Sequence, residues 1–147
     1  MSIFNGLAIN TSGLALERLK LDTISTNIAN VNTTRTAEGG PYKSKTVTFA
    51  ENMKNVQNQL NNNDAGFGNR MSYGVRVTGI KEDNTIKRTY DPTNPDANAN
   101  GYVRESNVNM ADQMVQMVQT MRTYEANVSA TEANKALLKN ALSISKN

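Results

Sequence analysis

Residues 110–128 read MADQMVQMVQTMRTYEANV, and the order of apolar and polar residues in this stretch decides the fold. Its apolar residues recur at alternating steps of four and three positions, the spacing of a stripe on a helix that packs against a partner helix. Asn109 and Asp112 form the start signal, an N-cap followed three residues later by an acidic side chain. The stripe is interrupted at Thr131 and Lys135 and then resumes. Its members are Met110, Met114, Met117, Met121, Tyr124, Val128, Leu138 and Leu142.

A matching stripe lies near the N-terminus. Its members are Ile3, Leu7, Leu14, Leu21, Ile24, Ile28 and Val31. We predict an N-terminal helix that ends between Asn30 and Thr34, where Asn and Thr side chains can hydrogen-bond to their own backbone. Gly6 and Gly13 weaken its first turns, so we expect those turns to be ordered only beside a partner. Because soluble proteins avoid exposed apolar helix faces, the two helices should pack against each other first.

The stretch between the two helices has a different composition. Seven of the nine Gly and all three Pro lie between Gly39 and Gly101. Gly and Pro disfavour helix interiors by about 1 and about 3 kcal/mol. Alternating patterns predict strands at 73–80 and 85–90, joined into a hairpin by residues 81–84, and a further strand at 42–49. A short helical stripe is predicted at 51–60.

These elements predict a mainly α fold with a β-containing middle. The long N- and C-terminal helices are expected to form an antiparallel coiled-coil inner domain. The expected parts are the N-terminal helix at 1–34, a central β-hairpin and loop region at 35–106, and the C-terminal helix at 107–147.

Charge and hydropathy exclude several classes of partner. The formal net charge is +3, but basic and acidic residues are interspersed along the chain, whereas a nucleic-acid binder needs a basic face. No apolar stretch approaches the roughly 20 residues of a membrane span. The first 30 residues lack the charged start and apolar run of a cleaved signal peptide. We therefore expect neither a nucleic-acid partner nor a membrane span.

The sequence offers no convincing catalytic or metal site. There is no His and no Cys, which removes the commonest general base, metal ligand and thiol nucleophile. A Ser-x-x-Lys match ends at Lys146, in the last five residues of the expected helix, where a frayed end could not hold a catalytic pair. Asp96–Gly101 fits the first half of a calcium loop, but the twelfth position is Asn107 rather than the required Glu. We expect no catalytic residues, no cofactor, no metal and no small-molecule substrate.

The methionine-rich stripe has two interpretations. Methionine at core positions fills irregular gaps, and on an exposed stripe it gives a deformable contact surface. Only 37% of the residues are apolar, below the roughly 45–50% of typical globular chains. The core of a monomer would be thin, so the interpretation as an interface is favoured. The abundant Asn could join neighbouring chains by uncharged hydrogen bonds, which is a hypothesis.

The motifs that border the two stripes carry a family resemblance. Residues 22–33 (DTISTNIANVNT) and 122–127 (RTYEAN) resemble the N- and C-terminal signatures of bacterial flagellar axial proteins of the rod and hook. The residues that match are Asn27, Ala29, Asn30, Asn32, Thr33, Tyr124, Glu125 and Asn127. Further motifs resemble the C-type proximal rod members, at 39–42, 74–77, 90–92, 101–103 and 107–109. Asn94 departs from the family pattern, which has a His between the two prolines.

The resemblance implies a structural function. The chain would be a subunit of the basal-body rod, a hollow drive shaft that crosses the periplasm and transmits torque for motility. Its implied partners are other flagellar rod subunits, copies of itself, the flagellar export apparatus and the MS-ring region. Export would proceed through the type III apparatus without a cleaved signal. Two alternatives remain: another type III-exported axial structural protein, or a helical adaptor or binding module.

Overall fold

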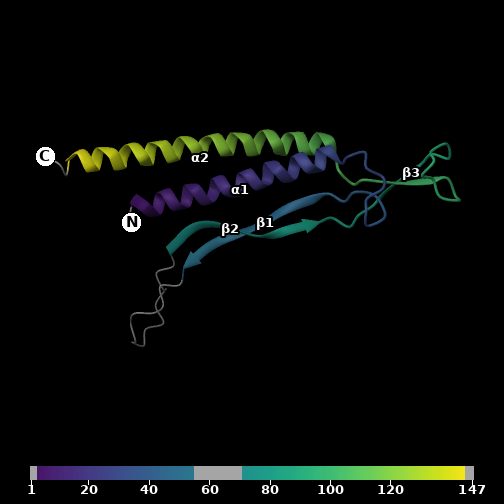
Figure 1. The fold of residues 1–147 in the computed structure, drawn as a ribbon, viewed down its shortest axis with the longest axis horizontal. Helices are drawn as coiled ribbons and strands as arrows, with labels where there is room; N and C mark the ends of the chain where they lie inside the picture. Colours follow the sequence, from purple (N-terminus) through teal and green to yellow (C-terminus); the bar gives the residue numbers. More distant parts are fainter. Residues whose placement is uncertain (1–2, 55–70, 145–147) are drawn as a thin grey trace, which may run out of the picture.

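The computed structural model of the chain describes residues 3–54 and 71–144. These residues form two long helices and four strands. In chain order they are α1 (Ile3–Ala29), β1 (Lys45–Lys54), β2 (Met71–Glu82), β3 (Lys87–Tyr90), β4 (Tyr102–Glu105) and α2 (Met110–Ile144). The helices run antiparallel, with both termini at one end of an elongated molecule and β3 at the other (Figure 1). The predicted mainly α fold with a β-containing middle is confirmed.

The helix boundaries follow from side chains that satisfy the backbone at the helix ends. Asn109 is the N-cap of α2, since its Oδ1 accepts a hydrogen bond from the backbone N–H of Ala111 at 3.1 Å. Its amide also donates to the Asp112 carboxylate at 2.8 Å, as the start signal predicted. At the end of α1, the Asn30 amide donates to the carbonyl of Thr26 at 2.9 Å. α1 ends at Ala29, next to the predicted range of Asn30 to Thr34.

The strands pair differently from the prediction. β2 pairs antiparallel with β1, with Val47 opposite Ile80, and β3 pairs with β4. The expected hairpin between 73–80 and 85–90 is therefore wrong. Between β2 and β3, the backbone N–H of Thr85 donates to the Asp83 carboxylate at 3.0 Å. This hydrogen bond also lowers the pKa of Asp83.

The helix predicted at 51–60 is wrong over residues 51–54. These residues belong to β1, because their backbone groups pair with the first half of β2. Residues 55–60 of that prediction lie outside the described part of the chain.

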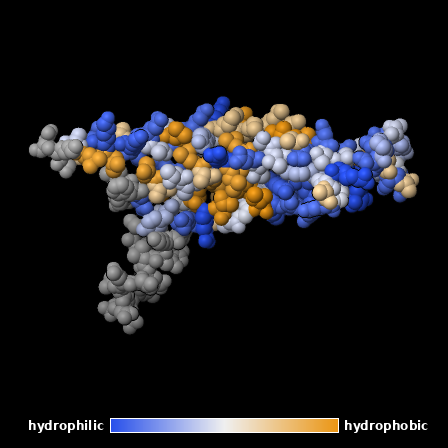
Figure 2. All heavy atoms as spheres, in the orientation of Figure 1, coloured by the Kyte–Doolittle hydropathy of each residue, from blue (hydrophilic) through white to orange (hydrophobic). Residues whose placement is uncertain are grey.

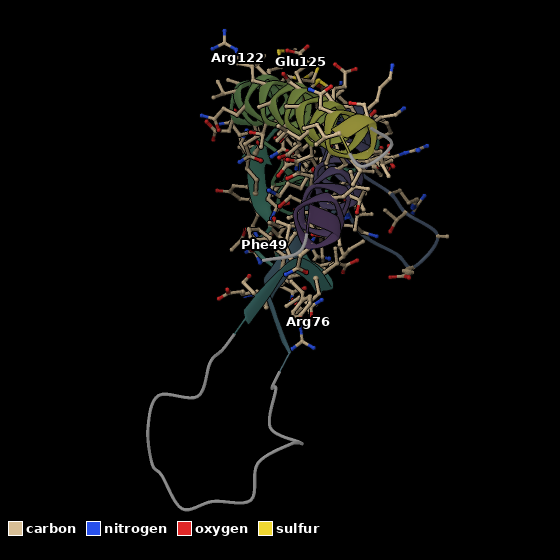
Figure 3. The ribbon with its side chains drawn as sticks, turned by 90° about the vertical axis from the view of Figure 1, so that its left-hand side faces the viewer. Phe49, Arg76, Arg122 and Glu125 are labelled. Atoms are coloured by element: carbon tan, nitrogen blue, oxygen red, sulfur yellow. The ribbon has the colours of Figure 1, made fainter. Side chains whose placement is uncertain are left out.

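Helix α1 lies between α2 and the β1–β2 hairpin (Figures 1 and 3). Leu16, Ile24 and Val47 are buried, while Tyr42, Val103 and Val108 are buried nearer the β3–β4 end. Among the described helices and strands, α2 packs against α1 alone. Consequently most of the circumference of α2 faces solvent in the single chain.

Candidate assembly surface

Small and polar residues of both helices lie at the contact between them. A Cβ atom on Gly6 would lie 3.3 Å from the Asn134 Nδ2, and a Cβ atom on Gly13 would lie 3.0 Å from the Asn127 Nδ2. Further along, the Asn27 amide donates to the Gln113 Oε1 at 2.9 Å. We call these contacts the polar seam. Its members are Gly6, Gly13 and Asn27 of α1, and Gln113, Thr120, Asn127 and Asn134 of α2.

Asn27 is the junction at which four parts of the chain meet. Its side chain is 1% exposed. The Nδ2 group donates to the Lys45 carbonyl at 2.8 Å as well as to Gln113, and the Oδ1 accepts from the Lys45 N–H and the Tyr42 hydroxyl, both at 3.0 Å. An asparagine side chain offers two donors and two acceptor lone pairs, so its hydrogen-bonding capacity is fully used. Burial raises the pKa of the Tyr42 phenol, which the nearby Lys45 ammonium partly offsets.

A second asparagine joins the central segments. The Oδ1 of Asn107 accepts from the backbone N–H of Ser44 at 2.7 Å. Its Nδ2 donates to the carbonyl of Asp83 at 3.1 Å and to the hydroxyl of Thr85 at 3.0 Å. For Asn27, Asn107, Asn109 and Asn127 the structure thus gives roles within the chain, whereas the hypothesis placed asparagines between chains.

The predicted N-terminal stripe occupies packed or half-packed positions on α1. Ile24 is buried with 6% exposure. Five members are partly exposed: Leu7, Leu14, Leu21, Ile28 and Val31. Ile3 begins α1, and its side chain lies outside the described part of the chain.

The predicted C-terminal stripe is divided between two environments. Met117, Tyr124, Val128 and Leu138 are partly buried. Met110, Met114, Met121 and Leu142 are exposed, with Met114 at 52% and Met121 at 43%. The structure does not place these four against α1, because Gln113, Thr120 and Asn127 occupy the facing positions instead. Their role in an interface stays a prediction.

Apolar residues of both stripes lie on the same flank of the helix pair. Each residue of a helix is rotated by about 100° from the one before it. Residues one position after the polar seam, Leu14 and Leu21 of α1 and Met114 and Met121 of α2, therefore point to the same side of the helix pair. Figure 2 shows apolar residues gathered across the middle of the two helices on this side. We call it the apolar flank. Its members are Leu14, Leu21, Ile28, Met110, Met114, Val118, Met121 and Val128.

The opposite flank carries a groove between α1, α2 and β1, with a volume of about 300 Å³. Its three walls include Lys20 of α1, Phe49 of β1 and Gln116 of α2. The Lys20 Nζ lies 4.7 Å from the centre of the Phe49 ring and 2.9 Å from the Glu17 carboxylate. Phe49 itself is 50% exposed and lies on the hairpin side of the molecule (Figure 3). The groove is therefore open and partly apolar, and each of its two lysines has a carboxylate neighbour, Glu17 beside Lys20 and Glu82 beside Lys45.

The described residues contain no cluster of acidic side chains that could hold a metal ion. In the calcium-like loop, the Asp96 carboxylate accepts a hydrogen bond from the Thr34 hydroxyl at 2.8 Å. Within the same described ranges, no helix has the length and apolarity needed to cross a membrane.

Comparison with known proteins identifies the family. The family model described as "Flagella basal body rod protein" matches residues 7–35, and "Flagellar basal body rod FlgEFG protein C-terminal" matches residues 99–144. The flagellar basal-body rod protein FlgC of Bacillus subtilis is 40% identical over 99% of this chain and 100% of its own length. FlgC of Borreliella burgdorferi is 37% identical, and FlgC of Salmonella typhimurium 30%, each over 98% of both chains.

The chain belongs to the FlgC family of flagellar basal-body rod proteins. The resemblance drawn from its motifs is confirmed. FlgC proteins are structural, and this chain is accordingly a structural subunit of the basal-body rod and not an enzyme.

In this FlgC family member, the motif residues have two kinds of environment. Asn27 and Asn127 lie in the polar seam, and Asn30 accepts a hydrogen bond from the Thr33 hydroxyl at 3.2 Å. Tyr124 is partly buried. Ala29, Asn32 and Glu125 are exposed. The first group is explained by contacts within one chain, and the exposed group is available to neighbours.

Sequence reasoning missed the polar seam and Tyr42. A signal for the seam was present, since Gln113, Thr120, Asn127 and Asn134 recur every seven residues, as do Gly6, Gly13 and Asn27 with Lys20 between them. The methionine pattern of the FlgC helix predicted a neighbouring stripe as the packing face instead. No local pattern marked Tyr42, because its partner Asn27 lies 15 positions away.

Proposed function

We propose that the chain polymerises with copies of itself and with other rod subunits into the hollow drive shaft that crosses the periplasm and transmits torque. The observation that carries the proposal is the apolar flank. It includes Met114 at 52% exposure and Met121 at 43%. Contiguous apolar surface of this kind marks a protein interaction site on a soluble chain.

In this proposal α1 and α2 act as an antiparallel coiled-coil inner domain. Contacts in the polar seam are spaced by seven or fourteen residues in each helix, multiples of the coiled-coil repeat. The seam itself consists of small and polar residues, and the exposed apolar flank is left uncovered in the single chain. Neighbouring subunits on the apolar flank would supply the missing burial.

Delivery and attachment belong to the same proposal. The export apparatus would pass the chain without a cleaved signal, and the MS-ring region would receive the base of the rod. Absence of Cys supports this route, since no disulfide can form in a chain that leaves a reducing compartment unfolded.

Complementation tests the proposal directly. A strain that lacks the chromosomal copy would express Leu21→Asp or Met121→Asp, each of which places a charge on the apolar flank. We expect both variants to lose swimming and to be absent from isolated basal bodies. Ala15→Asp, at an exposed position on the outer side of α1, is the matched control and should swim normally. Normal swimming of both flank variants would contradict the proposal.

A further inference from the structure

Two unlike surfaces lie on opposite flanks of the same helix pair. The apolar flank presents Met114, Val118 and Met121 of α2, of which Val118 is 46% exposed. The groove presents Gln116 and Gln119 of the same helix on its other side. From the polar seam, at about 100° per residue, these two sets point to opposite sides of α2.

The groove combines an apolar wall with basic groups at its rim. Ile24 and Val47 are buried in its floor, and Phe49 stands half-exposed at its side. Of the two lysines that line it, Lys20 is already paired with the Glu17 carboxylate at 2.9 Å, so Lys45 is the cation that an occupant can meet. Lys45 is only loosely held by Glu82, at 3.3 Å, with both side chains substantially exposed. An occupant with an apolar ridge and a carboxylate would therefore complement this groove.

The apolar flank provides such a ridge, and a carboxylate lies beside it. Glu125 lies one helical turn from Met121 and is exposed, and it points away from α1 (Figure 3). Within the described residues no ion pair involves Glu125. Methionine side chains are unbranched and polarizable, which suits them to an irregular apolar wall and to contact with an aromatic ring. The chain thus carries both halves of a complementary pair.

We propose that the apolar flank of α2 in one copy docks into the α1–α2–β1 groove of a second copy. Met114, Val118 and Met121 pack against Phe49, and the Glu125 carboxylate approaches Lys45. This inference rests on the proposed function and names the faces that polymerisation uses. The two faces lie on opposite flanks, so the contact is heterologous and each bound copy leaves one face free. Such contacts build rings or helical arrays rather than closed dimers.

Cysteine cross-linking tests the docking, because the chain has no Cys. Basal bodies would be isolated from cells that express Thr46→Cys together with Met121→Cys, and treated with a short bismaleimide. Thr46 is an exposed residue of the groove wall. We expect a ladder of dimer, trimer and higher cross-linked species. Each single variant should give no ladder. Val118→Cys with Phe49→Cys is a second pair that should give the same ladder if the first pair impairs assembly.

The matched control pairs Thr46→Cys with Ala15→Cys, which lies outside the apolar flank. A ladder of equal strength in this control would overturn the proposal. A chain present in basal bodies but without a ladder from either flank pair would also overturn it, while leaving the proposed function intact. Absence of the native, cysteine-free chain from isolated basal bodies would overturn both.

The charge on the flank gives an independent readout. Glu125→Lys in the double-cysteine background should reduce the yield of cross-linked species at least fivefold, since it brings a cation to Lys45. Glu125→Gln should give an intermediate yield. Equal yields in all three backgrounds would contradict the charge complementarity on which the choice of a second copy depends.

Discussion

At the scale of single residues, Asn27 connects more of the fold than any apolar side chain beside it. Its four hydrogen bonds join α1 to α2, to the start of β1 and to Tyr42. A leucine at this position would be as well buried, but it would leave the Gln113 Oε1 and the Lys45 N–H without partners. Unpaired buried groups cost about 1–3 kcal/mol each, so the hydrogen bonds explain why the residue is Asn.

The first prediction concerns this junction. Asn27→Ala should lower the free energy of unfolding by about 2–4 kcal/mol, because several buried partners lose their hydrogen bonds together. Urea denaturation of the purified chain, followed by circular dichroism, measures the change. Asn32→Ala is the control, since Asn32 is exposed and should change stability by less than about 0.5 kcal/mol. Equal effects of the two substitutions would contradict the role given to Asn27.

Tyr42 makes the stability of the same junction depend on pH. Burial raises the phenol pKa above its ordinary value of 10.0. The unfolded chain therefore loses the phenol proton at lower pH than the folded chain does. The stabilisation is fully present below pH 10 and is lost as the pH rises from 10 through the raised pKa. We expect the free energy of unfolding to fall more steeply above pH 10 in the native sequence than in Tyr42→Phe, measured by urea titrations between pH 8 and about 11.5. Parallel pH profiles would rule this out.

At the scale of elements, β2 docks onto α1 through its backbone. Gly74 has a φ of +96°, and a Cβ at this position would clash with the Ser12 hydroxyl. That hydroxyl accepts a hydrogen bond from the Val75 N–H at 3.1 Å. The absence of a side chain on Gly74 therefore allows the strand to approach the helix, and the positive φ explains why the residue is Gly.

Gly74→Ala should accordingly destabilise the fold by about 2–3 kcal/mol, from the strained backbone and the clash together. Gly79→Ala in the same strand is the matched control. Its new Cβ would lie 3.7 Å from the Thr48 hydroxyl, an ordinary contact. Differential scanning calorimetry of the two variants measures the difference in Tm. A Gly74→Ala protein as stable as Gly79→Ala would show that β2 does not depend on this close approach.

The elements differ in how far the sequence alone predicted them. Both helices and the Asn109 cap follow from local signals, namely heptad spacing and a capping side chain. Local signals do not predict which face of α2 packs against α1. A polar heptad at Gln113, Thr120 and Asn127 competes there with an apolar one at Met114 and Met121. The pairing of the strands was not predicted for another reason. Val47 and Ile80 are opposite each other but 33 positions apart in the chain, and local alternation carries no information on such a partner.

At the scale of the whole molecule, α1 is covered on two sides and α2 on one. The buried residues Leu16, Ile24 and Asn27 cluster in the middle and toward the C-terminal end of α1. Near the chain termini Gly6 lies against Asn134, and Leu142 and Ile144 are 61% and 77% exposed. The single chain is thus anchored at one end of its helix pair and weakly packed at the other.

This gradient predicts that ordering of the termini is coupled to assembly. In the free chain, amide hydrogens of residues 5–13 and 130–144 should exchange fast, because few buried contacts oppose local opening there. In the assembled rod the same amides should exchange slowly. Amides near Asn27 and Thr120 serve as the internal control and should be protected in both states. Hydrogen exchange read by mass spectrometry measures both states. Slow exchange at both ends of the free chain would separate ordering from assembly and would favour a helical adaptor that is complete as a monomer.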